Sequence, residues 1–271
     1  MKLLKQYFLF TFTISWVCFI TVAVIAQRTP LISPALQLLQ QVLVLLGTIT
    51  PSLVALFLTR RSGITGETTK LLGRIGRWQV NIKWYVFAVS YIAIIKLLAA
   101  IIYRVSTEAW PLFGQDAWYI MLIAILFSTW VQAGEEIGWR GFVLSRLTAK
   151  FGLALSTLLL GLVWSVWHLP LFFVKGADTF GQSFPLYLLQ VTALSVALGF
   201  LYWRTGGSLL LVMLMHAAVN NTKDIVPSAV QGATNQFALS NSLVAWLTVA
   251  LLWIFAIYFL IRMRAVKQMD E

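Results

Sequence analysis

The chain of 271 residues is 60% hydrophobic and only 11% charged. Soluble domains are about 45–50% apolar and about 25% charged, so the composition excludes an ordinary soluble protein and predicts a polytopic membrane protein. The net charge of +11 lies mainly between the apolar segments. This distribution favours the lipid bilayer and its anionic head groups as the partner and argues against nucleic acid. A single cysteine, Cys18, excludes an intrachain disulfide.

Apolar segments long enough to cross a bilayer, about 20 residues each, follow one another along the chain. The first, residues 7–26, is longer than the apolar part of a signal peptide and is interpreted as a retained span. We predict an all-α fold of about eight transmembrane helices that forms a single integral membrane domain over residues 1–271. The expected helices cover residues 7–26, 36–59, 84–103, 117–150, 153–174, 184–203, 208–221 and 243–261.

Basic residues are concentrated in alternate connections of this topology. The N-terminus, residues 60–83, residues 140–150 and the C-terminal tail all lie on one side. Because cytoplasmic loops carry an excess of Lys and Arg, both termini are predicted to be cytoplasmic, with the protein in the cell membrane.

The fourth expected helix carries charge where hydrocarbon cannot tolerate it. Two adjacent glutamates, Glu135 and Glu136, and then Arg140 follow a long apolar run. An unpaired charge in hydrocarbon costs at least about 3 kcal/mol, so such residues usually serve a purpose. Glu136 and Arg140 can pair on one helix face, as a structural support of a site or as an interhelical clamp. Glu135 is rotated from Glu136 by roughly 100°, so it stays available for another role.

The depth of Glu135 decides where this helix ends. A helix that stopped near Val131 would place Glu135 close to one membrane face, far from the polar residues of the next helix. We therefore expect the helix to continue to Lys150. It then has 34 residues and a length of roughly 51 Å, with Glu135 near its middle.

The two histidines of the chain both lie in apolar helices. His168 follows Trp164 by one turn, and Pro170 loosens the helix beside it by removing a backbone donor. His216 and Asn220 are four apart on one face of the seventh helix. A lone intramembrane His or Asn often only joins helices. Polar groups in three central helices together predict a polar catalytic cavity among helices four, five and seven.

These residues resemble the motifs of the CAAX-protease and bacteriocin-processing (CPBP) family of intramembrane proteases, which includes the prenyl-protein endopeptidases. The motif EExxxR is matched at residues 135–140, the aromatic-xxx-His motif at 164–168 and the HxxxN motif at 216–220. The resemblance covers about residues 117–221, and Trp164 stands where many members have Phe. It implies a peptidase that hydrolyses a peptide bond of a membrane-associated, CAAX-type prenylated substrate.

The four polar groups suited to the chemistry form two pairs. Glu135 and His168 can orient and deprotonate a water molecule. His216 and Asn220 can donate hydrogen bonds to the oxyanion that forms when water attacks a peptide carbonyl. The family resemblance implies the same catalytic residues, and no serine or cysteine nucleophile with a partnered base stands out.

Metal dependence is a separate question. Glu135, His168 and His216 would satisfy the usual set of catalytic zinc ligands. The HExxH motif is absent, however, and the four polar groups already fill the roles of base and oxyanion donors. Hydrolysis without a cofactor is therefore the favoured hypothesis, and a zinc enzyme is the alternative.

Two other classes of protein fit the polar cluster. A catalytically inactive scaffold, or an immunity or regulatory protein of the same fold, would bind a membrane partner, and substitution of Glu135 would leave its function intact. A transporter could use the cluster as a proton or ion relay, but it would be expected to have paired discontinuous helices in two halves, which the sequence does not show. The complete set of motifs favours an enzyme.

Overall fold

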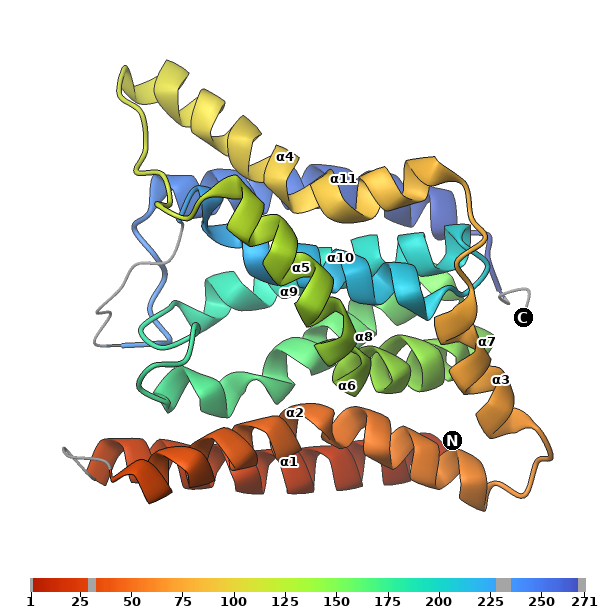
Figure 1. Ribbon diagram of the computed structural model, residues 1–271. Coiled ribbons are helices and arrows are strands. Elements are labelled where there is room, and N and C mark those ends of the chain that lie inside the picture. Colours follow the sequence, from red (N-terminus) through yellow and green to blue (C-terminus); the bar gives the residue numbers. More distant parts are fainter. Residues whose placement is uncertain (1, 29–32, 228–234, 268–271) are drawn as a thin grey trace.

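The computed structural model of the protein describes residues 2–28, 33–227 and 235–267. Every regular element in these ranges is helical (Figure 1). Seven of the helices in these ranges are long and apolar enough to cross a membrane. The predicted all-α fold of a polytopic membrane protein is therefore confirmed.

In the described ranges, five α-helices start after a polar side chain that accepts a hydrogen bond from a backbone N–H of the first turn. Such caps precede α2, α4, α9, α10 and α11, at Ser33, Asn81, Ser183, Ser208 and Ser242. The elements are α1 (Lys2–Arg28), α2 (Pro34–Arg61), α3 (Glu67–Gly73), η1 (Arg74–Gly76), α4 (Ile82–Thr107), α5 (Trp118–Val131), α6 (Ala133–Glu136), η2 (Ile137–Leu144), α7 (Ser145–Phe151), α8 (Leu153–Trp167), η3 (Leu169–Phe173), α9 (Phe184–Arg204), α10 (Leu209–Thr222), η4 (Lys223–Ile225) and α11 (Leu243–Met263).

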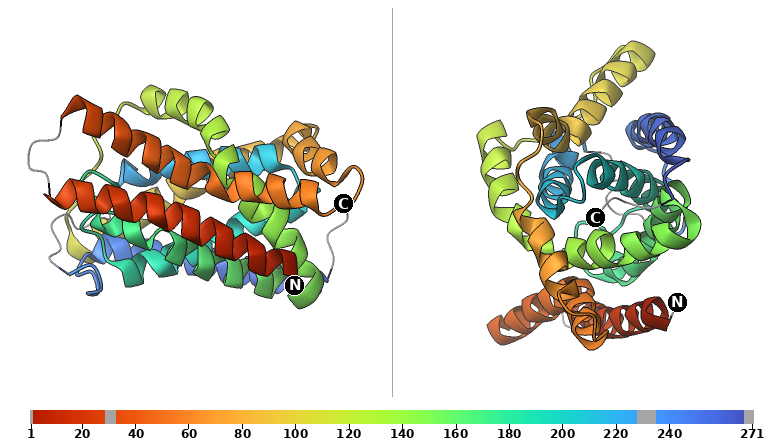
Figure 2. Two further views of the ribbon diagram at one scale, coloured as in Figure 1. Left: turned by 90° about the horizontal axis from the view of Figure 1, so that it is seen from below. Right: turned by 90° about the vertical axis from the view of Figure 1, so that its right-hand side faces the viewer.

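The helix predicted at residues 208–221 is α10, which is shorter than a full span. It has 14 residues and rises about 21 Å, less than the roughly 30 Å of a hydrocarbon core. It runs in the direction opposite to α9 and α11 and packs mainly against α4 and α5, and α1 starts and α11 ends at the same end of the molecule (Figures 1 and 2). Which side of the membrane this end faces stays a prediction.

The fourth predicted helix continues through the glutamates, as expected. One helical segment of 34 residues covers Trp118–Phe151, and within it η2 is a π-helix. A π-helix is rare and is frequent at functional sites. Here it begins immediately after Glu136, so the winding of the helix changes beside the two carboxylates.

The helix predicted at residues 153–174 changes its winding at His168. The α-helix ends at Trp167, and a 3₁₀-helix, η3, follows. Pro170 has no N–H with which to continue the α-helical ladder, which accounts for the change. His168 therefore lies at the junction of the two helical segments.

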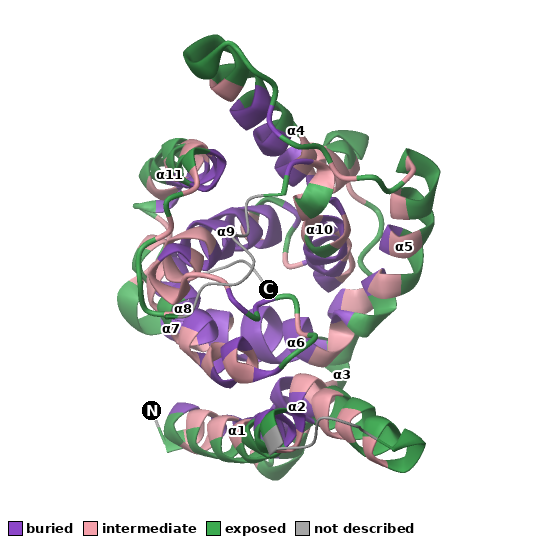
Figure 3. Ribbon diagram, turned by 90° about the vertical axis from the view of Figure 1, so that its left-hand side faces the viewer, coloured by how far each residue is buried: buried purple, intermediate pink, exposed green. Residues whose placement is uncertain are grey.

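The helices form a buried centre with a two-helix flank. α1 and α2 lie side by side along one flank (Figure 2), whereas α9 is the most enclosed of the long helices. Buried residues are concentrated on α6, α8, α9 and α10 (Figure 3). Large apolar side chains such as Phe127 and Ile254 are exposed at the periphery, where they suit contact with lipid.

Candidate active site

The carboxylate of Glu136 has two side-chain partners, Arg140 and His216. Its side chain is 0% exposed, and the Arg140 Nη1 group donates to both of its oxygens, at 2.8 and 3.1 Å. Nδ1 of His216 lies 2.7 Å from Oε1 of the same carboxylate. Both oxygens of Glu136 are thus engaged, and the carboxylate joins the helical segment Trp118–Phe151, called the motif helix below, to α10.

Glu135 lies in a different environment although it is the next residue. It is 6% exposed, and its Oε2 accepts a hydrogen bond of 2.8 Å from Nε1 of Trp164 on α8. Among the described residues none donates a hydrogen bond to its Oε1, and Arg140 pairs with Glu136 instead. The predicted division between the two glutamates is therefore present in the geometry.

Trp164 is the centre of the cluster. Its ring lies 5.6 Å from that of His168 and 5.2 Å from that of His216, measured between centroids. The guanidinium carbon of Arg140 lies 4.2 Å from the Trp164 ring centroid, a cation–π contact. The sequence placed Trp164 only beside His168. In the fold its indole also supplies the donor to Glu135, which phenylalanine at this position could not do.

The backbone fixes the tautomer of His168. Nδ1 lies 2.8 Å from the carbonyl oxygen of Trp164, and a carbonyl can only accept, so Nδ1 carries the hydrogen. In the neutral imidazole Nε2 then holds the free lone pair. The ring also packs against Trp167 and Tyr187. His168 and Glu135 both contact Trp164 and share no direct hydrogen bond among the described residues.

The two asparagines at the end of α10 behave differently. Asn220, the predicted oxyanion donor, is exposed, and its side chain makes no hydrogen bond to another described residue. Asn221 donates from Nδ2 to Ser128 Oγ at 2.7 Å and to the Ala217 carbonyl at 2.8 Å. Asn221 thus ties α10 to α5. Sequence reasoning gave it only the role of a helix end, because its partner lies 93 positions away.

A metal site is not evident in the described part of the chain. No group of three or more His, Cys, Asp or Glu side chains there has the arrangement of metal ligands. Both histidines nevertheless have Nδ1 against an oxygen and Nε2 left over, an orientation that serves a zinc ligand as well as a base. Zinc binding by Glu135, His168 and His216 stays a prediction.

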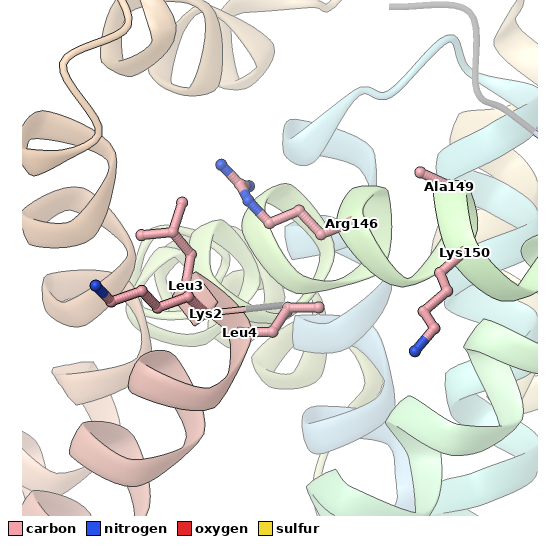
Figure 4. Close-up of a pocket in the computed structure, with 6 residues that line it drawn as sticks. All are labelled: Lys2, Leu3, Leu4, Arg146, Ala149 and Lys150. Carbon is pink, nitrogen blue, oxygen red and sulfur yellow. The ribbon is translucent and has the colours of Figure 1, made fainter.

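A recess of about 590 Å³ opens near the start of α1 and contains none of the motif residues (Figure 4). It is lined by Lys2, Leu3, Leu4, Arg146, Ala149 and Lys150. The charged ends of its three cations point in different directions (Figure 4), and the Arg146 guanidinium is paired with Glu67. The recess does not gather groups for catalysis, so the candidate active site is the cluster around Trp164.

Known proteins match the segment that carries this cluster. Residues 114–222 match the family described as Type II CAAX prenyl endopeptidase Rce1-like. The chain is also similar to CAAX prenyl protease 2 of Methanococcus maripaludis, with 22% identity over 233 residues that cover 82% of this chain and 84% of the relative. The family match includes all three motifs. The segment that carries the three motifs is therefore similar to the Type II CAAX prenyl endopeptidases, which supports a peptidase, and the seven candidate spans of the described residues support an integral membrane protein.

Proposed function

We propose that the protein is an intramembrane endopeptidase that hydrolyses a peptide bond of a prenylated, CAAX-type protein at the membrane. The observation that carries the proposal is the unequal use of the two glutamates. Glu136 is saturated by Arg140 and His216, whereas Glu135 is held by a single neutral donor and keeps Oε1 for another partner. The family description and the name of the relative both support a prenylated substrate.

In the proposed reaction a water molecule lies between Oε1 of Glu135 and Nε2 of His168. Glu135 takes one proton from the water as its oxygen attacks the peptide carbonyl carbon, and His168 orients the water through Nε2. The carbonyl oxygen becomes an oxyanion. The intermediate collapses when the carbon–nitrogen bond breaks, and the proton held by Glu135 passes to the leaving amine.

The oxyanion would be stabilised from α10. The amide of Asn220 can donate to it directly. His216 has its Nδ1 hydrogen directed at Glu136, so it can donate through Nε2 only as an imidazolium, in which both nitrogens carry hydrogen. Glu136 thus acts on the reaction through His216 and not on the water.

The bundle end that holds α3 and α7 is proposed to face the cytoplasm. Basic residues are concentrated there, among them Arg60, Arg61, Lys70 and Lys150, which fits the excess of positive charge in cytoplasmic loops. A substrate carrying a prenyl group would then reach the site from that side, with its lipid in the bilayer.

The test uses the purified protein in liposomes with a farnesylated peptide ending in a CAAX sequence. The same peptide without the prenyl group is the second substrate, and mass spectrometry reads the products. We expect the wild type to cleave the prenylated peptide and the folded Glu135→Gln variant not to. Equal cleavage by both proteins would overturn the assignment of Glu135. Equal cleavage of both peptides would overturn the substrate class.

A further inference from the structure

A serine on α2 bridges the backbone of the motif helix on either side of the two glutamates. The hydroxyl of Ser52 donates to the Ala133 carbonyl at 2.6 Å and accepts from the Gly138 N–H at 3.3 Å. Ala133 and Gly138 are five residues apart, the separation that a π-helix joins by a direct hydrogen bond. The hydroxyl of another helix therefore links these two groups where α6 passes into η2.

Close packing holds the hydroxyl in place. A Cβ atom added at Gly138 would lie 2.6 Å from the carbonyl carbon and oxygen of Pro51, and one at Gly134 would lie 3.0 Å from Cγ2 of Ile49. The motif helix thus needs glycine at 138 to approach the backbone of α2 this closely, and a side chain at 134 would require Ile49 to shift. Ser52 itself is 6% exposed, so no bulk solvent replaces its hydroxyl if it is removed.

The helix that presents Ser52 is itself supported from α1. Pro51 has no N–H, so the Gly47 carbonyl loses its donor within α2. The hydroxyl of Ser15 on α1 donates to that carbonyl at 2.8 Å. Two serine hydroxyls therefore support the motif helix one after the other. One completes α2 at its proline, and the next bridges the motif helix.

We propose that Ser52 is a positioning residue for the glutamate pair, an inference that rests on the proposed endopeptidase function. Glu135 and Glu136 lie between the two backbone groups that Ser52 bridges, and they must point at different partners, Trp164 and Arg140. The bridge fixes the winding of the helix at this point, and the winding fixes the angle between the two carboxylates. Loss of the hydroxyl lets Glu135 move away from the reacting water.

The experiment compares four variants in the liposome cleavage assay. Ser52→Ala removes the hydroxyl. Ser52→Thr and Ser52→Val have the same shape and differ only in the hydroxyl. Ser195→Ala is the matched control, because the buried Ser195 hydroxyl also donates to the carbonyl of a neighbouring helix, Thr157 at 3.0 Å, away from the glutamates. Folding is checked by size exclusion and thermal unfolding, and hydrogen–deuterium exchange is measured for residues 132–144.

We expect kcat to fall by about tenfold or more in the Ala and Val variants of Ser52, since small misplacements of a reacting group have effects of this size. KM stays within about twofold of the wild type, as expected for a loss confined to the transition state. Ser52→Thr and Ser195→Ala keep a kcat close to that of the wild type. Segment 132–144 exchanges faster in Ser52→Val than in Ser52→Thr.

Three results would overturn the proposal: an unchanged kcat in Ser52→Val, an equal loss in Ser195→Ala, or folding of the Thr variant when neither Ala nor Val folds. The last would mean that the hydroxyl serves folding alone. If the wild type does not cleave the peptide, the endopeptidase function fails separately. The exchange rates then decide whether Ser52 fixes this segment, and equal rates in the Thr and Val variants would refute it.

Discussion

Glu135 and Glu136 are neighbours in the chain, yet they belong to two different regions of the cluster. The region around Glu136 is ionic and closed, with Arg140 and His216 on one carboxylate. The region around Glu135 is aromatic, with the Trp164 indole as the one donor to this carboxylate among the described residues and with the His168 ring in contact with the same indole. The comparison teaches that one helix can direct adjacent carboxylates into different environments, because Glu136 is joined to Arg140 and to His216 of α10 whereas Glu135 is joined to Trp164 of α8.

Substitutions in the ionic region around Glu136 should have the largest effect. We expect them to lower the stability of the folded protein. Glu136→Gln or Arg140→Ala leaves a buried charge without its partner, which costs about 3–5 kcal/mol. We expect little folded protein from either variant, measured as the monodisperse fraction in size exclusion and as a lowered unfolding temperature. The double variant Glu136→Gln with Arg140→Met should regain part of the folded yield, because it no longer buries a lone guanidinium. A folded, thermally unchanged Arg140→Ala protein would contradict this view of the region.

A substitution of Glu135 should leave the protein folded and abolish cleavage of the substrate. Glu135→Gln keeps a group that can accept from Trp164, so its unfolding temperature should stay close to that of the wild type. Loss of a general base lowers the rate by about 100- to 10,000-fold. Single-turnover cleavage of the farnesylated peptide measures the loss. If Glu135→Gln and Glu136→Gln lose folded protein to the same degree, the two regions are not distinct.

The hydrogen bond that Trp164 Nε1 donates can be tested separately from the packing of its ring. Trp164→Phe keeps a ring against both histidines but removes the donor to Glu135, and we expect kcat to fall by roughly threefold to tenfold. The loss of a hydrogen bond to a charged group is expected to lower stability by about 1.5–3 kcal/mol. Trp167→Phe is the control, since the buried Trp167 Nε1 has no partner among the described residues. Equal effects of the two substitutions would assign the change to packing rather than to the hydrogen bond.

The smallest expected effects separate the two asparagines of α10. Asn221→Ala loses the link from α10 to α5 and should lower the free energy of unfolding by about 1–2 kcal/mol. Asn220→Ala removes an exposed side chain and should change stability by less than about 0.5 kcal/mol, while lowering kcat if it donates to the oxyanion. Denaturation midpoints and cleavage rates of the same two preparations provide the comparison. A destabilised Asn220→Ala protein would show that Asn220 also supports the fold.

The sequence predicted those features of the fold and of the candidate site that depend on the spacing of residues within one helix. The extension of the fourth helix through Lys150 and the separate partners of Glu135 and Glu136 both follow from helical geometry and from the cost of a buried charge. The bridge by Ser52 could not be predicted, because its partners lie 81 and 86 positions along the chain. The helices are apolar on most faces, so their sequences do not indicate which faces meet.

The early end of α10 changes what lies at the depth of the membrane interior. Beyond Thr222 the backbone leaves the α-helix, and the Val226 carbonyl accepts a hydrogen bond of 3.1 Å from Lys96, a residue in the middle of α4. Lipid cannot solvate irregular backbone, which is tolerated at such depth only inside protein or beside water. The irregular backbone past α10 is therefore expected to lie against protein or water and not against lipid, and the buried ammonium of Lys96 supplies it with one donor.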